Sequence, residues 1–148
     1  DEPFNTGVEI NLNTPCLLPD DYVPDVHLRL ILYKRIANAN KDELIRIKIE
    51  LIDRFGMLPQ EALYLLRMSI IKQTVNRMYI KKINMNASGG YIQFDTSSKI
   101  DIENLICMIS ANDIYQMNGQ HRLNFRCELN DYEERFDFIE NLLDGLSN

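Results

Sequence analysis

The stretch that decides the fold reads IRIKIELIDRF-GMLP-QEALYLL and occupies residues 45–66. Its first part repeats apolar residues at helical spacing. That spacing predicts an inward stripe of Ile45, Ile49, Ile52 and Phe55, widened by Leu44, Leu51 and the stem of Lys48. Gly56 follows, at a position where a helix end favours the left-handed backbone that glycine adopts without strain. Pro59 suits the first turn of a second helix, so we expect two helices that pack together and anchor the domain.

The opposite face of the first of these helices is charged and carries Arg46, Glu50, Asp53 and Arg54. Glu50 and Asp53 lie three residues apart, so their carboxylates leave the helix on the same side. Arg46 and Arg54 each lie four residues from Glu50, where an ion pair contributes a few tenths of a kcal/mol. Taken alone, these residues favour a salt-bridged surface helix, and a docking surface for a partner is the alternative.

The remaining periodicity predicts further helices and two hairpins, which segregate rather than alternate one to one. We expect a strand at 8–12 and helices at 26–39, 41–55 and 59–78. A hairpin follows, with strands at 80–85 and 91–94 around a turn at 86–90, and then a helix at 102–109. A second hairpin, of 114–117 and 122–126, precedes a last helix that Asn130 caps, with Glu133 in capping-box position. The first helix has an inward stripe of Leu28, Ile31, Leu32, Tyr33 and Ile36.

This order predicts an α+β fold: an N-terminal strand, a three-helix layer, then two β-hairpins with a short helix between them and a C-terminal helix. A chain of 148 residues is long enough for one domain with a real core. We expect residues 8–148 to form that single domain and residues 1–7 to form a flexible tail. Because the chain begins at Asp1, we also expect it to be a piece of a longer protein.

Composition argues against several functional classes. The net charge of −6 suits a basic protein partner better than a phosphate backbone. The three cysteines are scattered and form no CxxC, and neither histidine has metal-ligand spacing. No phosphate-binding loop and no apolar run of about 20 residues occurs. The sequence therefore predicts no catalytic, cofactor or metal site and no membrane segment.

Basic residues on the predicted strands keep a second function open. These residues are Lys81, Lys82, Arg122 and Arg126, and they lie near the aromatic residues Tyr79, Tyr91 and Phe125. Cations and aromatic rings on a sheet are the chemistry that binds single-stranded nucleic acid. Strand aromatics more often fill a core, so an accessory nucleic-acid-contacting domain is the alternative to a protein-docking domain.

Specific runs of residues resemble a known family. LLPDDYVPDV at 17–26, LRL and LYKRIA at 28–30 and 32–37, and ELIDRFGMLP at 50–59 are similar to the C-terminal domain of the Mfd-type bacterial transcription-repair coupling factor. His27 stands where the family pattern leads us to expect Asn, and Tyr79 stands where a small residue often ends the third helix. Neither departure lies in the diagnostic run at 50–59.

The resemblance implies a non-catalytic regulatory domain of a cytoplasmic bacterial protein. The parent family is an ATP-dependent DNA translocase that removes stalled RNA polymerase and recruits UvrA for nucleotide excision repair. The implied role of this domain is autoinhibition, by docking on the UvrA-binding module of the same chain and masking it. Glu50 and Asp53 then contact arginines of that module, flanked by Arg46 and Arg54. ATP and Mg belong to the parent's motor, so we expect no cofactor and no direct nucleic-acid contact here, and the resemblance favours docking for this face.

Overall fold

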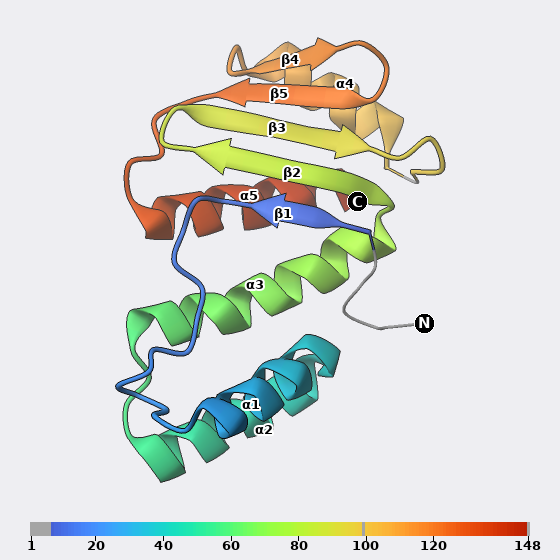
Figure 1. Ribbon diagram of the computed structural model, residues 1–148. Coiled ribbons are helices and arrows are strands. Elements are labelled where there is room, and N and C mark those ends of the chain that lie inside the picture. Colours follow the sequence, from blue (N-terminus) through green and yellow to red (C-terminus); the bar gives the residue numbers. More distant parts are fainter. Residues whose placement is uncertain (1–6, 99, 148) are drawn as a thin grey trace. The chain divides into compact units, whose positions relative to one another are not determined.

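The computed structural model describes residues 7–98 and 100–147. In chain order its elements are β1 (Glu9–Asn11), α1 (Val26–Asn38), α2 (Lys41–Phe55), α3 (Gln60–Arg77), β2 (Ile80–Asn86), β3 (Gly89–Phe94), α4 (Ile102–Ala111), β4 (Tyr115–Asn118), β5 (Arg122–Arg126) and α5 (Tyr132–Ser147) (Figure 1). The predicted α+β fold and element order are confirmed. The predicted tail lies outside the described residues except for Gly7. None of the described helices is long and apolar enough to span a membrane.

Two compact units make up the described chain, and the division falls inside α3. The three-helix unit contains residues 15–71, and the sheet unit contains residues 7–14 together with the described part of 72–148. Each unit has its own buried side chains. The expectation of a single domain over residues 8–148 stays a prediction.

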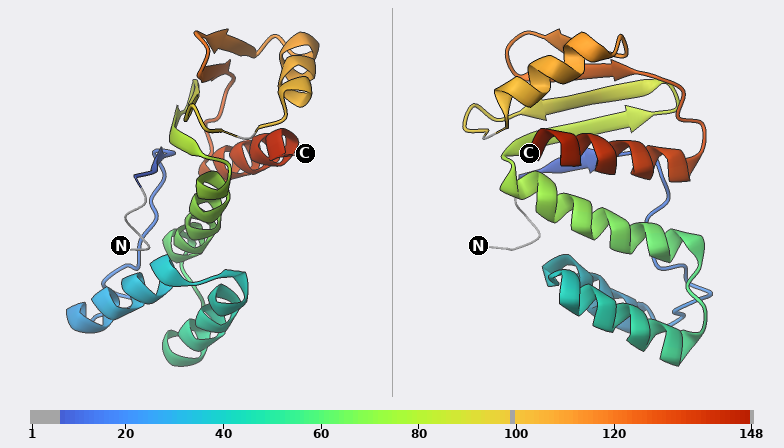
Figure 2. Two further views of the ribbon diagram at one scale, coloured as in Figure 1. Left: turned by 90° about the vertical axis from the view of Figure 1, so that its right-hand side faces the viewer. Right: turned by 180° about the vertical axis from the view of Figure 1, so that it is seen from behind.

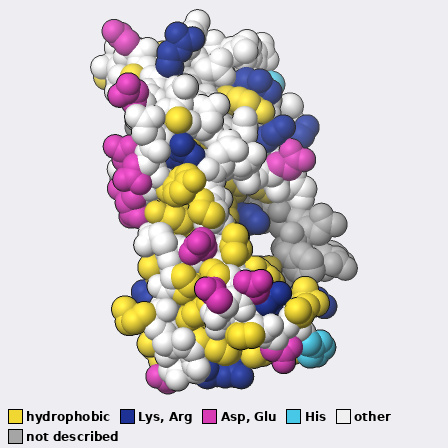
Figure 3. Space-filling model, turned by 60° about the vertical axis from the view of Figure 1, so that its left-hand side comes forward, with side chains coloured by type: hydrophobic (Ala, Val, Ile, Leu, Met, Phe, Trp, Pro, Cys, Tyr) yellow, Lys and Arg dark blue, Asp and Glu magenta, His cyan; other side chains and the backbone are white. Residues whose placement is uncertain are grey.

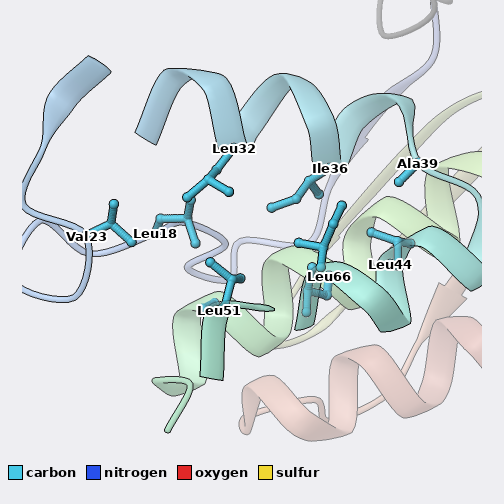
Figure 4. Packing of buried hydrophobic residues seen from close by; sticks show 10 residues of the cluster. Leu18, Val23, Leu32, Ile36, Ala39, Leu44, Leu51 and Leu66 are labelled. Carbon is cyan, nitrogen blue, oxygen red and sulfur yellow. The ribbon is translucent and has the colours of Figure 1, made fainter. Parts of the chain in front are cut away.

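The three-helix unit is built around one apolar cluster contributed by all three helices and by the connector before α1. Figure 4 shows side chains of α1, α2 and α3 directed toward one another, with two connector residues at one end. The buried members are Leu18, Val23, Leu32, Ile36, Ala39, Leu44, Ile47, Leu51, Ala62 and Leu66. The Ser69 hydroxyl, also buried, donates to the Ile36 carbonyl at 3.0 Å, so α3 is tied to α1 by a hydrogen bond as well as by packing.

Helix ends in the three-helix unit are fixed by capping side chains and by a glycine. The Asp25 carboxylate accepts hydrogen bonds from the first turn of α1. At α2, Asn40 and Glu43 form the reciprocal capping box, with bonds of 2.9 and 3.2 Å. Gly56 has a φ of +91° at the end of α2, in the region where glycine alone is unstrained.

The cap predicted for the last helix is wrong by one residue. Asp131, not Asn130, accepts from the Glu133 N–H, and Glu134, not Glu133, accepts from the Asp131 N–H at 3.1 Å. Both neighbours have capping side chains and both are followed three residues later by glutamate, so the local pattern fits either register.

The sheet unit holds a mixed sheet with strand order β1-β2-β3-β5-β4. β1 is parallel to β2, and the other neighbours are antiparallel. Helices α4 and α5 both lie on one face of this sheet (Figure 2). The central row facing them is apolar and runs Ile10, Ile83, Ile92, Leu123 and Met117 across the five strands.

Arg135 of α5 is buried in the sheet unit, where its guanidinium links two other segments of the chain by hydrogen bonds. Its Nε donates to the Leu129 carbonyl at 2.7 Å, and one terminal nitrogen donates to the Asn13 carbonyl at 2.9 Å. These bonds hold the chain after β1 against α5. Because the guanidinium is used by backbone carbonyls, it is not a surface counter-ion for the acidic residues of that helix.

The hairpin of β2 and β3 is tighter than predicted. The predicted turn is confirmed but is shorter than 86–90, since Asn86 ends β2, and Gly89 and Gly90 already belong to β3. Gly90 pairs with Met85 on one side and Phe125 on the other. A Cβ on Gly90 would lie 2.8 Å from the Met85 Cα and would collide with the Asn84 carbonyl oxygen. The glycines therefore permit close strand approach as well as a turn.

Replacing Gly90 by alanine should destabilise the fold by about 1–3 kcal/mol, because the added methyl group overpacks a fixed backbone. Urea unfolding monitored by circular dichroism measures this change. Gly145→Ala is the matched control, since its Cβ would meet only the Met108 methyl at 3.5 Å. An alanine in that helix should stabilise by up to about 1 kcal/mol. Equal effects at the two glycines would contradict the close-approach explanation.

Candidate docking surface

The rotation of α2 about its axis differs from the prediction. Leu44, Ile47 and Leu51 are buried, with 4, 3 and 1% of their surface exposed. Ile45, Ile49 and Ile52, predicted to face inward, are 59, 55 and 37% exposed. These three residues, here named the isoleucine stripe, lie on one side of the helix because successive residues turn by about 100°. The prediction is wrong because α2 has apolar residues on two sides, and the core around α1 uses the other one.

The same kind of error affects α1, where Ile31 is 42% exposed instead of buried. Exposed apolar residues are therefore frequent in the three-helix unit. In the part of Figure 3 that shows this unit, apolar side chains reach the surface directly beside acidic ones. A surface of this kind is typical of a protein-interaction site rather than of a purely solvated face.

Glu50 lies at the edge of α2 that meets α1 and is held by arginines of its own unit. Its two carboxylate oxygens accept from the two terminal nitrogens of Arg35, at 2.9 and 3.0 Å. Arg54, one turn along α2, adds a longer contact of 3.5 Å. The Glu50 side chain keeps 35% of its surface exposed. The salt-bridged helix that the spacing favours is therefore present at Glu50 and Arg54, and Arg35 from the neighbouring helix adds a closer contact that the spacing did not indicate.

The fork-like contact from Arg35 lowers the pKa of Glu50 below its ordinary value of 4.5. Partial burial opposes this shift, and Arg54 reinforces it. The same bond raises the pKa of Arg35. Both groups stay charged at neutral pH. Since both side chains remain well exposed, the pair stabilises the fold only modestly.

Asp53 is the carboxylate that stays available. Its side chain is exposed, and no residue within 7–98 or 100–147 forms an ion pair or hydrogen bond with it. It lies one turn after Ile49 and next to Ile52, so it borders the isoleucine stripe. Asp53 and the stripe together form the outward face of α2, which we name the α2 face.

Arg46 lies two turns before Asp53 on α2, at a shallow hollow between α1 and α2. The hollow has a volume of about 350 Å³ and is lined by Lys34, Arg35, Asn38, Glu43, Arg46 and Ile47. The structure thus brings Glu50 and Arg54 together, leaves Asp53 on the α2 face, and places Arg46 at the hollow between the helices.

Two parts of this surface were missed from the sequence. Arg35 is fifteen residues from Glu50 and on another helix, so no local spacing indicates the pair. The isoleucine stripe had a signal, because Leu44, Ile47, Leu51 and Phe55 form an equally regular apolar series. Of these two regular series, only the one with Leu44, Ile47 and Leu51 faces the core.

Comparison with known proteins assigns the chain to a family. Residues 12–105 match the family model of the TRCF domain. The chain belongs to the TRCF domain family. Two curated relatives, the transcription-repair-coupling factors of Haemophilus influenzae and Escherichia coli, are each 38% identical over 137 residues. The resemblance seen in residues 17–59 is confirmed by these matches.

The TRCF domain is a small part of those relatives. Each alignment covers 91% of this chain and 12% of the relative. The transcription-repair-coupling factor of Buchnera aphidicola subsp. Baizongia pistaciae is 35% identical, with 98% of this chain and 21% of the relative covered. The fold is also that of a crystal structure of the C-terminal domain of transcription-repair coupling factor, with a TM-score of 0.75 and 24% identity over 94% of this chain and 93% of that one.

Glu50→Gln should lower the free energy of unfolding by up to about 1 kcal/mol at neutral pH. Because the folded pKa of Glu50 is lowered, its stabilisation is present above pH 4.5 and is lost as the pH falls through the folded pKa. The difference in free energy of unfolding between Glu50→Gln and the unsubstituted chain, measured by urea unfolding, should therefore shrink below that pH. Arg35→Gln should cause the same pH-dependent loss, and the double variant should add little. A difference that stays constant in acid would contradict the pair.

Proposed function

We propose that this chain is a non-catalytic regulatory domain of a transcription-repair coupling factor. It docks through the α2 face on the UvrA-binding module of the same longer protein and masks it until the parent engages stalled RNA polymerase. ATP-dependent translocation on DNA, removal of polymerase and recruitment of UvrA in the bacterial cytoplasm belong to the other parts of that protein. The observation that supports docking is the exposed isoleucine stripe with the available carboxylate of Asp53 beside it.

The α2 face combines the two contributions that a reversible contact needs. The stripe offers apolar surface, which contributes about 25 cal/mol for each Å² removed from water. Asp53 offers a charged acceptor that an arginine contacts with two hydrogen bonds, which fixes the orientation of the partner. A tethered partner is present at high effective concentration, so a small interface is sufficient.

Glu50 contributes to docking in a different way from Asp53. An ionised carboxylate has about four acceptor positions, of which Arg35 uses two and Arg54 a weaker third. A partner arginine therefore adds to Glu50 by using the remaining position or by replacing Arg54. When a partner arginine replaces Arg54, one ion pair of Glu50 is lost as another forms. Glu50 therefore positions the contact and adds little net affinity.

The test is a titration of this chain against the isolated UvrA-binding module at moderate salt, by calorimetry. Asp53→Arg removes an acceptor and introduces a repelling charge, so affinity should fall by roughly 10- to 100-fold. Ile49→Ala removes apolar contact area and should weaken binding by several-fold. Glu50→Gln should have a smaller effect than Asp53→Arg.

Matched controls separate docking from general damage. Asp21→Arg reverses an exposed acid of the connector, and Ile106→Ala truncates an equally exposed isoleucine of α4. Both controls should bind the module with the same affinity as the unsubstituted chain. If Asp53→Arg and Ile49→Ala bind the module as tightly as the controls do, the proposed docking face is wrong.

A further inference from the structure

Within the described residues of the sheet unit, one face of the sheet carries no helix. Helices α4 and α5 lie on the other face (Figure 2). The strand register aligns the outward side chains in rows across the sheet, and we name this surface the open sheet face. The first row is Glu9, Lys82, Gln93, Arg122 and Asn118; the second is Asn11, Asn84, Tyr91, Asn124 and Gln116; the third is Asn86, Gly89 and Arg126.

Amide side chains dominate this face, and its only charged residues besides Glu9 are basic. Apolar aliphatic residues are absent from the three rows, which distinguishes the face from an ordinary protein-docking sheet. Of the strand cations considered from the sequence, Lys82, Arg122 and Arg126 share this face. Glu9 lies 3.6 Å from the Lys82 ammonium and is itself largely exposed, so it leaves that lysine accessible.

Tyr91 and Arg122 form a flat platform near the centre of the open sheet face. The guanidinium carbon of Arg122 lies 4.0 Å from the centre of the Tyr91 ring. The Arg122 Nε donates to the Gln93 side-chain oxygen at 2.9 Å, which fixes the plane of the guanidinium over the ring. Guanidinium planes and aromatic rings are the surfaces on which unpaired nucleobases stack.

A hollow adjoins this platform at the β1 edge. Its volume is about 510 Å³, and its polar lining is formed by Glu9, Asn11, Lys72, Lys82 and Asn84. Two ammonium groups and two amides at a concave edge suit a phosphate and its sugar. Lys82 is charged at neutral pH, as lysines ordinarily are, and its contacts with the Tyr91 hydroxyl and with Glu9 raise its pKa further.

Charge in the sheet unit is divided between its two sides. The exposed side of α5 carries Glu133, Glu134, Asp137 and Asp144, and that helix packs on the sheet face opposite the rows. These four acids of the sheet unit thus lie on the side away from the open sheet face. A polyanion meets the cations and amides first when it approaches the rows.

We propose that the open sheet face binds single-stranded RNA. Bases stack on the platform of Tyr91 and Arg122, phosphates lie near Lys72 and Lys82, and the amide rows bond base edges and 2′-hydroxyls. The face has few cations and many amides, so affinity depends on hydrogen bonds and stacking more than on phosphate neutralisation. RNA offers one more hydrogen-bonding group per nucleotide than DNA, which favours RNA on such a surface. The inference concerns the sheet unit and is independent of docking by α2.

The experiment is a fluorescence anisotropy titration of a labelled mixed-sequence RNA of about twelve nucleotides with this chain in low salt, in parallel with DNA of the same sequence. We expect RNA to bind in the micromolar range that is typical of weak nucleic-acid contacts, and DNA to bind several-fold more weakly. Tyr91→Leu should weaken RNA binding by about 5- to 100-fold, because one stacking surface is lost.

Lys82→Gln provides a readout that a purely structural role would not change. Removing one phosphate contact should lower the slope of log affinity against log salt by about 0.7. Lys34→Gln, on α1, removes one exposed cation from the other unit and should leave both affinity and slope unchanged. Thermal melts of each variant confirm that the fold is intact.

Three results would overturn the proposal. The first is no RNA binding at about 100 µM protein, the weak end of non-specific affinity. The second is equal binding of DNA. The third is a folded Tyr91→Leu or Lys82→Gln variant that binds like Lys34→Gln. Loss of docking in the α2 variants with RNA binding retained, or the reverse, distinguishes failure of one proposal from failure of the other.

Discussion

The burial of Leu44, Ile47 and Leu51 fixes the rotation of α2, and the surface of the three-helix unit depends on that rotation. Burying one such side chain contributes about 1.5–3 kcal/mol, whereas an exposed ion pair contributes at most about 1 kcal/mol. The apolar core therefore decides the rotation, and the contact of Arg35 with Glu50 follows from it. Once these three residues face inward, the isoleucine stripe has to face outward, and Asp53 lies beside it.

Local chemistry made much of the fold predictable. Asp25, Asn40 and Gly56 act within one turn of their own positions, so the local sequence is sufficient to make them helix boundaries, as was predicted for Gly56. The hairpin strands were also placed to within a few residues, because alternation and turn residues are local signals. The predictions failed where the local sequence fits two alternative structures equally well. Asn130 and Asp131 each fit a capping box, and only the packed position of α5 selects the second.

The candidate site was harder to predict because its contacts join distant parts of the chain. The charges of α2 could be identified, but the partner of Glu50 comes from α1, and helix packing brings it there. The sheet shows the same limit. Alternation along β2 and β5 places Lys82 and Arg122 on strands, yet the platform of Tyr91 and Arg122 requires β5 to be the neighbour of β3. Strand order is a property of the whole fold, which residue spacing does not encode.

The internal pairing of Glu50 suits the docking that we propose, in which the contact has to open. Two free carboxylates would bind two partner arginines strongly, and the parent protein would need a large free-energy change to release them. With Glu50 already satisfied by Arg35, the proposed docking gains little from that residue, and we expect most of its affinity to come from the isoleucine stripe and Asp53. Apolar contact tolerates small shifts, while a single arginine contact at Asp53 sets the register. The closed state is then specific without being too stable to open.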